Sequence, residues 1–198
     1  MSRIGVLGGT FDPIHYGHLF IAEAVCARAR LDRVLFVPVG APAHRRVFAS
    51  AGERAAMVER AIAGNPAFAL DATALEQPGP VYTADTLPLM RAKYPADELN
   101  FIAGLDSLTV SKWRRLDEVA NAVAAFYVVR REGAHAENLD AVIGDLPAHL
   151  RSRFVAMDLP LVDISATVIR ERVKAGEPIR YLAPDAVARY IEEKKLYR

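Results

Sequence analysis

The chain has 198 residues, of which 52% are apolar and 25% charged, a balance typical of a globular protein with a sizeable core. Its 25 basic and 24 acidic residues give a formal net charge of +1, which excludes recognition of nucleic acid or an anionic membrane through overall charge. The single cysteine excludes an internal disulfide, and neither a signal peptide nor a run of about 18 apolar residues is visible, so we expect one cytoplasmic domain over residues 1–198.

Four short apolar segments, partly β-branched, are predicted as strands that are buried on both faces. They are residues 4–7, 34–37, 99–103 and 125–129. Longer segments with helical patterns lie between them. Because strands and helices alternate, the sequence predicts an α/β fold, a Rossmann-like, doubly wound parallel sheet with helices on both faces. Ligands of such sheets bind beyond the carboxyl ends of the strands, where the strand order reverses.

Three of the predicted helices have recognisable ends. Ser50 and Glu53 form the pattern of a capping box, which predicts the start of a helix. A later helix is expected to begin near Ser165 and to stop at Gly176. The last is expected from Pro184, with this proline in its first turn.

The stretch GGTFDPIHYGHL at residues 8–19 joins the first strand to the first helix, whose body is predicted at residues 19–25. Its glycines fit neither the dinucleotide-binding fingerprint nor a phosphate-binding P-loop, so neither a hydride-transferring enzyme nor a P-loop kinase is indicated. His18 is expected in the first helical turn and His15 just before it, where free N–H groups and the macrodipole attract phosphate. The alternative is that both histidines only cap the helix or pack. Structural zinc is a weaker interpretation, because one cysteine and five histidines provide few ligands.

GGTFDPIHYGH resembles the T/HxGH signature of the nucleotidylyltransferase superfamily, in the form found in bacterial nicotinate-nucleotide adenylyltransferases. The resemblance extends along nearly the whole chain, through PVGAPAHR (38–45), VYTADTL (81–87), GLDSLTVSKW (104–113), VVRR (128–131) and ISATVIRER (164–172). It implies that nicotinate mononucleotide attacks the α-phosphorus of ATP and yields deamido-NAD and pyrophosphate. Such an in-line displacement requires positioning and charge stabilisation but no protein nucleophile.

The resemblance also implies which residues meet ATP. His15, His18 and Arg170 are the expected catalytic residues, because they can contact and neutralise phosphate oxygens. The expected ATP-binding residues are Gly8, Gly9, Thr10, Phe11, His15, His18, Gly104, Asp106, Ser165, Thr167 and Arg170. Mg²⁺ is expected to bridge phosphate oxygens of ATP, with no residue assigned as its ligand.

Three residues in this half of the site have a simple structural alternative. Ser165 is equally explained as a helix N-cap, and Asp106 either accepts hydrogen bonds from ribose hydroxyls or belongs to a turn. Asp12 either helps to organise metal-bound water or serves an Asp-Pro turn.

The other half of the predicted site meets the mononucleotide. Trp113 offers a stacking face for the pyridine ring, although packing in the core is its alternative. Arg130 or Arg131 matches a family arginine near the mononucleotide, and His44 and Arg45 look like the basic segment that meets substrate phosphate. Either pair of basic residues could instead be solvated surface charge. The expected nicotinate mononucleotide-binding residues are His44, Arg45, Tyr82, Thr83, Trp113 and Arg130. Arg114 and Arg115, beside Trp113, add positive charge that favours an acidic ring substituent.

Two alternative functions are kept beside this prediction. Phosphopantetheine adenylyltransferases share the H-x-G-H motif, but VYTADTL and Trp113 favour a pyridine nucleotide as substrate. A non-catalytic nucleotide-sensing module predicts loss of the phosphate-binding residues, whereas His15, His18 and Arg170 are present. The expected partners are ATP and nicotinate mononucleotide, without nucleic acid or membrane, and the prediction allows a homo-oligomer.

Overall fold

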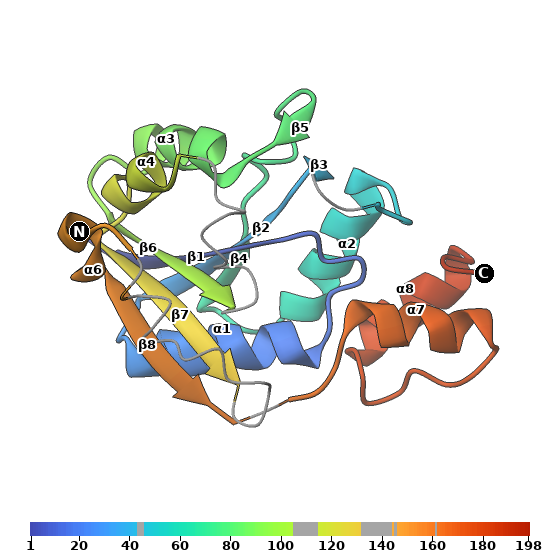
Figure 1. Cartoon of the computed structure of the whole chain (residues 1–198). Coiled ribbons are helices and arrows are strands. Elements are labelled where there is room, and N and C mark those ends of the chain that lie inside the picture. The colour runs from blue at the N-terminus through green and yellow to red at the C-terminus, as the bar shows by residue number, and fades with distance from the viewer. Residues whose placement is uncertain (43–45, 105–114, 132–143, 145, 161) are drawn as a thin grey trace.

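The computed structural model describes residues 1–42, 46–104, 115–131, 144, 146–160 and 162–198. Its centre is a six-stranded sheet in the order β4-β2-β1-β6-β7-β8, in which every pairing is parallel (Figure 1). The strands are β1 (Arg3–Gly9), β2 (Arg33–Pro38), β4 (Phe68–Leu70), β6 (Glu98–Gly104), β7 (Ala125–Arg131) and β8 (Phe154–Leu159). A small second sheet pairs β3 (Ala41–Pro42) with β5 (Pro80–Val81).

The order of the strands reverses beside β1. From β1 the chain first adds β2 and β4 on one side, and then returns to build β6, β7 and β8 on the other. In the register, Val6 of β1 lies opposite Leu35 of β2 and Phe101 of β6. The predicted doubly wound parallel sheet is therefore confirmed, and the carboxyl ends of β1 and β6 mark its switch point.

Helices cover both faces of the sheet, as predicted. Alternate residues of each strand face opposite sides; in β2, for example, Val34 and Phe36 belong to one apolar cluster and Leu35 and Val37 to another. The first cluster packs against α1 (Tyr16–Arg28), α2 (Ala51–Ile62), α7 (Ala166–Lys174) and α8 (Asp185–Glu193). The second packs against α3 (Thr83–Lys93), α4 (Leu116–Asn121) and α6 (Ala148–Arg151), and Figure 1 shows α3 and α4 across the sheet from α1.

The predicted helix ends can be compared with the caps in the structure. The Ser50 Oγ accepts a hydrogen bond from the Glu53 N–H (3.3 Å), and a Glu53 carboxylate oxygen accepts one from the Ser50 N–H (2.8 Å), which confirms the capping box. Ser165 is the N-cap of α7, and Gly176, with φ of +72°, follows the end of this helix. Pro184 is the N-cap of α8, so its predicted place in the first turn is wrong by one position.

Several elements were absent from the sequence prediction because their local patterns are weak. Helix α3 contains Pro88, a residue that removes a backbone donor from a helix interior. Strand β8 is an edge strand with three exposed residues, and β4, at the other edge, has only three residues. In each case, contacts with the rest of the fold outweigh the weak local signal.

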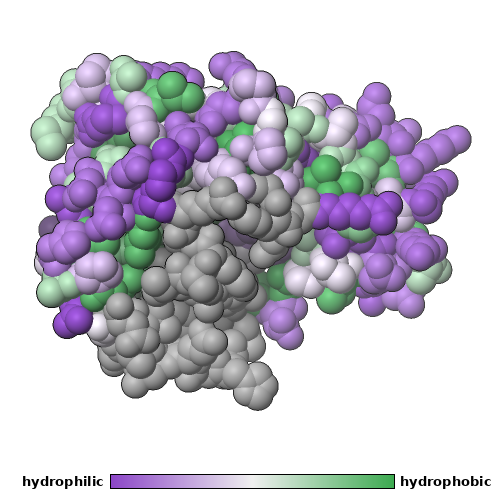
Figure 2. All heavy atoms as spheres, turned by 45° about the horizontal axis from the view of Figure 1, so that its top comes forward, coloured by the Kyte–Doolittle hydropathy of each residue, from purple (hydrophilic) through white to green (hydrophobic). Residues whose placement is uncertain are grey.

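The surface is mixed in character. Figure 2 shows hydrophilic and hydrophobic residues interspersed over the described part of one face. None of the helices in the described ranges combines the length and the apolar character that a membrane span requires.

Candidate active site

A cavity of about 770 Å³ lies at the carboxyl ends of the central strands. Its walls come from the ends of β1 and β6 and from the first turns of α1 and α7. The site is thus at the switch point of the sheet, where two helix N-termini offer free N–H groups. The residues predicted to bind ATP that lie in the described part of the chain all line this cavity: Gly8, Gly9, Thr10, Phe11, His15, His18, Gly104, Ser165, Thr167 and Arg170.

His15 and His18 lie together at the start of α1. His15 is the N-cap residue and His18 lies in the first turn, with the two ring centroids 3.7 Å apart. The His15 backbone N–H donates a hydrogen bond to Nδ1 of His18 (3.3 Å). Because Nδ1 is the acceptor, the neutral His18 ring has its proton on Nε2, which makes Nε2 a hydrogen-bond donor.

Two neighbours fix the positions of these rings. The Phe11 ring meets the His18 ring edge to face, with centroids 5.0 Å apart. A Cβ atom at Gly17 would lie 3.0 Å from Nδ1 of His15 and 3.1 Å from its Cε1. A side chain at position 17 would therefore require the His15 ring to shift, which explains why a glycine stands between the two histidines.

Arg170 reaches the cavity from the second turn of α7. Its guanidinium donates hydrogen bonds to the Asp12 carbonyl oxygen (2.8 Å) and to Thr167 Oγ1 (3.0 Å). It also lies 4.5 Å from the centroid of the Phe48 ring. These contacts leave a permanently positive group beside the two histidines, so the cavity joins imidazole donors, helix N-termini and one arginine.

The Asp12 carboxylate is buried and has structural partners. One oxygen accepts a hydrogen bond from the Phe48 N–H (2.7 Å), and the other accepts from the Ala49 N–H (3.2 Å) and the Tyr197 hydroxyl (2.7 Å). Of the two interpretations of Asp12, these contacts favour the structural one. The described residues contain no group of three His, Cys, Asp or Glu side chains that could hold a metal ion.

Arg54 is a buried residue behind the site, where it holds loops that line the cavity, and the sequence analysis missed it. It donates hydrogen bonds to the carbonyl oxygens of Thr10 (2.7 Å), Gly40 (2.6 Å) and Ala49 (3.3 Å). Burial lowers the pKa of Arg54, and the nearby Asp12 opposes that shift. Arg54 thereby ties the loop after β1 to the segments that follow β2 and precede α2. Its place in the helical pattern of α2 gave no signal of this role.

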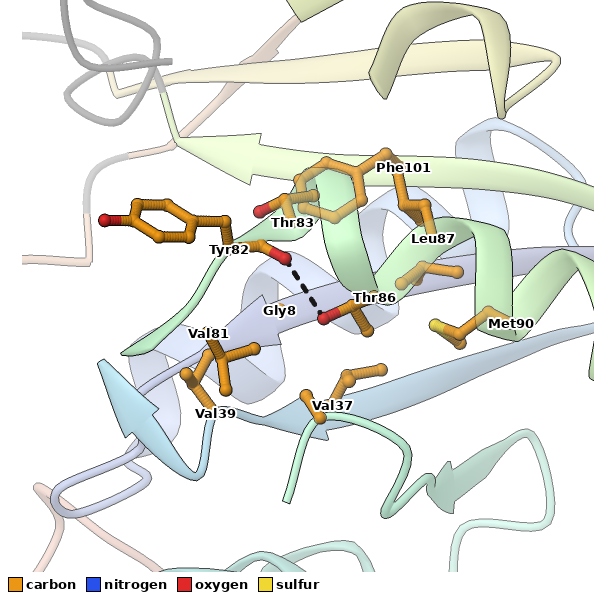
Figure 3. A pocket seen from close by; sticks show the side chains of 12 residues that line it. Gly8, Val37, Val39, Val81, Tyr82, Thr83, Thr86, Leu87, Met90 and Phe101 are labelled. Carbon is orange, nitrogen blue, oxygen red and sulfur yellow. Dashed lines mark hydrogen bonds between the residues drawn. The ribbon is translucent and has the colours of Figure 1, made fainter. Parts of the chain in front are cut away.

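A smaller apolar pocket of about 60 Å³ adjoins the large cavity and shares Gly8, Val39, Val81, Thr83 and Phe101 with it. Figure 3 shows valine side chains on one side of this pocket and Phe101, Leu87 and Met90 on the other. Tyr82 and Thr83, both predicted to bind the mononucleotide, lie at its rim. Thr83 is the first residue of α3, so the start of this helix, where the first backbone N–H groups have no helical acceptor, lies beside the pocket.

The remaining predictions for the mononucleotide half are not decided. His44, Arg45 and Trp113 lie outside the described residues, and Arg130 is in β7. Asp106, predicted to bind ATP, also lies outside the described residues. Arg115 is paired with Asp85 and with Glu118 (3.3 Å), so its charge is compensated within the protein. The effect of Arg115 on an acidic ring substituent stays a prediction, and within the described residues its charge is shared with these two carboxylates.

Known proteins resemble this chain over its full length. Residues 6–172 match the family described as cytidylyltransferase-like. The nicotinate-nucleotide adenylyltransferase of Bacillus subtilis is 40% identical over 200 residues, which are 100% of this chain and 99% of the relative. The probable nicotinate-nucleotide adenylyltransferase of Thermomicrobium roseum is 41% identical over 201 residues, which are 100% of this chain and 92% of the relative.

A solved structure supports the fold. The Plasmodium falciparum nicotinic acid mononucleotide adenylyltransferase complexed with NaAD has a TM-score of 0.79 and 17% sequence identity, over 100% of this chain and 98% of that one. Its strand-and-helix arrangement is thus the same despite a distant sequence. On the full-length identity to its bacterial relatives, this chain belongs to the nicotinate-nucleotide adenylyltransferase family.

Proposed function

We propose that this protein transfers the adenylyl group of ATP to nicotinate mononucleotide and forms deamido-NAD and pyrophosphate, a step of NAD biosynthesis. The observation that supports this function is the cavity in which His15, His18 and Arg170 meet two helix N-termini. Imidazole N–H groups, backbone N–H groups and a guanidinium are the donors that a triphosphate requires. Many anions could bind at such a site, and the family membership is the reason for proposing nicotinate mononucleotide as the acceptor of the adenylyl group.

In the proposed reaction, a phosphate oxygen of the mononucleotide attacks the α-phosphorus while pyrophosphate leaves on the opposite side. The Nε2–H of His18 donates to a phosphate oxygen, and His15 acts beside it at the same helix start. Arg170 neutralises charge on the triphosphate. No side chain forms a covalent intermediate, so these groups accelerate the step by alignment and by stabilising developing charge.

Mg²⁺ fits this proposal only as an ion held by the nucleotide. Both oxygens of Asp12, the one acidic residue among the described residues that line the cavity, already accept hydrogen bonds from the protein. Mg²⁺ commonly keeps several waters and binds substrate phosphates, which agrees with a site that offers few protein ligands. When bound, the ion would reduce the negative charge of the triphosphate. A cytoplasmic location is part of the same proposal, as is the use of Mg²⁺.

The small pocket supports a preference for nicotinate over nicotinamide. The first turn of α3, at Thr83, presents backbone N–H groups, which stabilise a carboxylate more than a neutral amide. The acidic residue of that turn, Asp85, is paired with Arg115, so its repulsion of a second carboxylate is reduced. The arginine thus supports the acid preference by neutralising Asp85 and not by contacting the ring.

Pyrophosphate release tests the proposed function directly. ATP is supplied with nicotinate mononucleotide, nicotinamide mononucleotide or pantetheine phosphate, in separate reactions with and without Mg²⁺. We expect the highest kcat/KM with nicotinate mononucleotide, by about a hundredfold if a few charge-assisted hydrogen bonds distinguish acid from amide. Turnover with pantetheine phosphate alone would reject the assigned substrate. Binding of ATP without turnover of any acceptor would favour the nucleotide-sensing module.

A further inference from the structure

The chain returns to the cavity after its last helix. Beyond α8, Lys195 and Tyr197 adopt left-handed backbone conformations, with φ of 52° and 64°. Leu196, between them, is buried in the core. A positive φ is unfavourable for residues with side chains, so it persists where surrounding contacts hold it. Here the turns bring the Tyr197 hydroxyl to Asp12, where it donates a hydrogen bond of 2.7 Å.

The Tyr197 hydroxyl is a dependable donor. Burial raises its pKa, and the hydrogen bond to Asp12 raises the pKa further. The phenol therefore keeps its proton at neutral pH. The ring also belongs to the partly buried residues packed against the core, which restricts its orientation.

Asp12 connects this hydroxyl to Arg170. Its carboxylate accepts hydrogen bonds from Tyr197 and from the Phe48 N–H, and its carbonyl oxygen accepts one from the Arg170 guanidinium (2.8 Å). The Phe48 ring packs against the same guanidinium. Phe48 is 55% exposed, so the core holds it little, and the hydrogen bond from its N–H to Asp12 fixes the backbone from which the ring extends.

We propose that Tyr197 is a positioning residue for adenylyl transfer, because its hydroxyl holds Asp12 and thereby two of the groups that contact the Arg170 guanidinium, the Asp12 carbonyl and the Phe48 ring. Thr167 Oγ1 is the third contact. The inference rests on the proposed function. Without the hydroxyl, the Asp12 carboxylate keeps the backbone donors of Phe48 (2.7 Å) and Ala49 (3.2 Å) but loses the shorter of the two hydrogen bonds to one of its oxygens. Asp12 is then held less firmly, and so are the Asp12 carbonyl and Phe48. Small displacements of a positioned charge reduce the rate of a reaction that depends on alignment.

The test compares Tyr197→Phe, Arg170→Ala and the double variant. Tyr197→Phe keeps the ring and removes only the hydroxyl. We expect kcat/KM for ATP to fall about tenfold, as for loss of one hydrogen bond to a charged group, while KM for nicotinate mononucleotide changes less than about twofold. In the Arg170→Ala background the same substitution should change kcat/KM less than about twofold, because the group that it positions is absent. Tyr181→Phe, at a site 79% exposed, is the matched control and should equal the wild type.

Each result decides the inference. Rate constants are expressed per folded protein, measured by circular dichroism, so a loss of stability alone leaves them unchanged. Wild-type kinetics for Tyr197→Phe, or an equal loss with and without Arg170, would overturn the positioning role. Absence of wild-type turnover would instead overturn the proposed function. In that case calorimetry with α,β-methylene-ATP still tests the role of Tyr197. Tyr197→Phe should weaken binding of this analogue when Arg170 is present and leave it unchanged in the Arg170→Ala background.

Discussion

At the scale of single residues, His18 offers the sharpest prediction. His18→Ala removes the Nε2–H donor, so we expect kcat to fall by about a hundredfold or more, the usual effect of losing one preorganised donor. The thermal unfolding midpoint should stay close to the wild-type value. His149→Ala is the control, because His149 pairs with Asp117 on the surface and does not line the cavity. A His18→Ala protein that unfolds but keeps its specific activity in the folded fraction would show that the residue only packs.

Arg170→Ala should weaken the use of ATP. A charge-assisted contact with phosphate is lost, so we expect KM for ATP to rise and kcat/KM to fall about tenfold or more. Lys174→Ala, at the exposed end of the same helix, removes an equal charge and should leave both constants unchanged. Initial rates over a range of ATP concentrations check this. An unchanged dependence on ATP would remove Arg170 from the site.

The residues of the site differ in how far the sequence alone could predict them. His15 and His18 were predictable, because both belong to one helix start and their spacing is local. The contacts of Asp12 were not, since they join residues that are 36, 37 and 185 positions apart. Arg54 is similar, because it lies 44 positions from Thr10. A sequence pattern contains local spacings such as that of the two histidines, but not contacts between residues that are distant along the chain.

At the scale of secondary-structure elements, the capping box of α2 predicts a measurable stability. Ser50→Ala removes the acceptor for the Glu53 N–H and the donor to its carboxylate, and should lower the free energy of unfolding by about 1 kcal/mol. Ser50→Thr keeps a hydroxyl and should lose much less. Urea unfolding of the three proteins provides the comparison. Equal stabilities for Ala and Ser at this position would mean that the tertiary contacts of α2 alone determine its start.

The secondary-structure elements also show which parts of the fold a local sequence pattern can predict and which it cannot. Four strands could be predicted because each is a run of apolar residues in the interior of the sheet. Edge strand β8 has the burial pattern of a half-exposed segment, so it lacked that signal. The interior Pro88 argued against α3, although Ala84, Leu87 and Met90 bury this helix against the sheet. Burial of an apolar face therefore outweighed the propensity of one residue.

At the scale of the whole molecule, the alternation of strands and helices predicted the architecture, because parallel strands require a crossover between them. The order of the strands could not be predicted from these patterns, since each strand is apolar on both faces and accepts any neighbour. The extent of one domain over residues 1–198 and the oligomeric state stay predictions. The position of the site followed from the architecture, because the switch point is a property of the complete sheet.

The stability of the molecule should depend on pH through Asp71. This buried carboxylate at the end of β4 accepts hydrogen bonds from the Lys93 ammonium (2.9 Å), the Tyr94 hydroxyl (2.7 Å) and the Thr73 N–H (2.9 Å). Burial acts to raise its pKa, but these hydrogen bonds outweigh burial and lower it. The folded-state pKa of Asp71 thus lies below the unfolded value of about 3.9. The stabilisation of the folded state by the ionised carboxylate is therefore complete above about pH 3.9 and is lost as pH falls through the folded pKa.

Asp71→Asn should therefore reduce the free energy of unfolding at pH 7, and the difference from the wild type should shrink below about pH 4. Asp163→Asn, an exposed position, sets the background for removing one negative charge. Urea unfolding at a series of pH values measures both. A difference that stays constant down to acidic pH would mean that the variant acts through packing and not through the ionised carboxylate.

The hydrogen bond between Asp12 and Tyr197 also has a consequence for the biosynthesis of the protein. The chain is made from its N-terminus, so Asp12 of the GGTFDPIHYGH motif leaves the ribosome 185 residues before the tyrosine that contacts it. Every strand and every catalytic candidate precedes that tyrosine. A nascent or prematurely terminated chain can thus contain the whole sheet and both histidines and still lack the contact that orients Arg170. Full activity is then acquired late in translation, after the sheet is complete, because the contact between Asp12 and Tyr197 forms last.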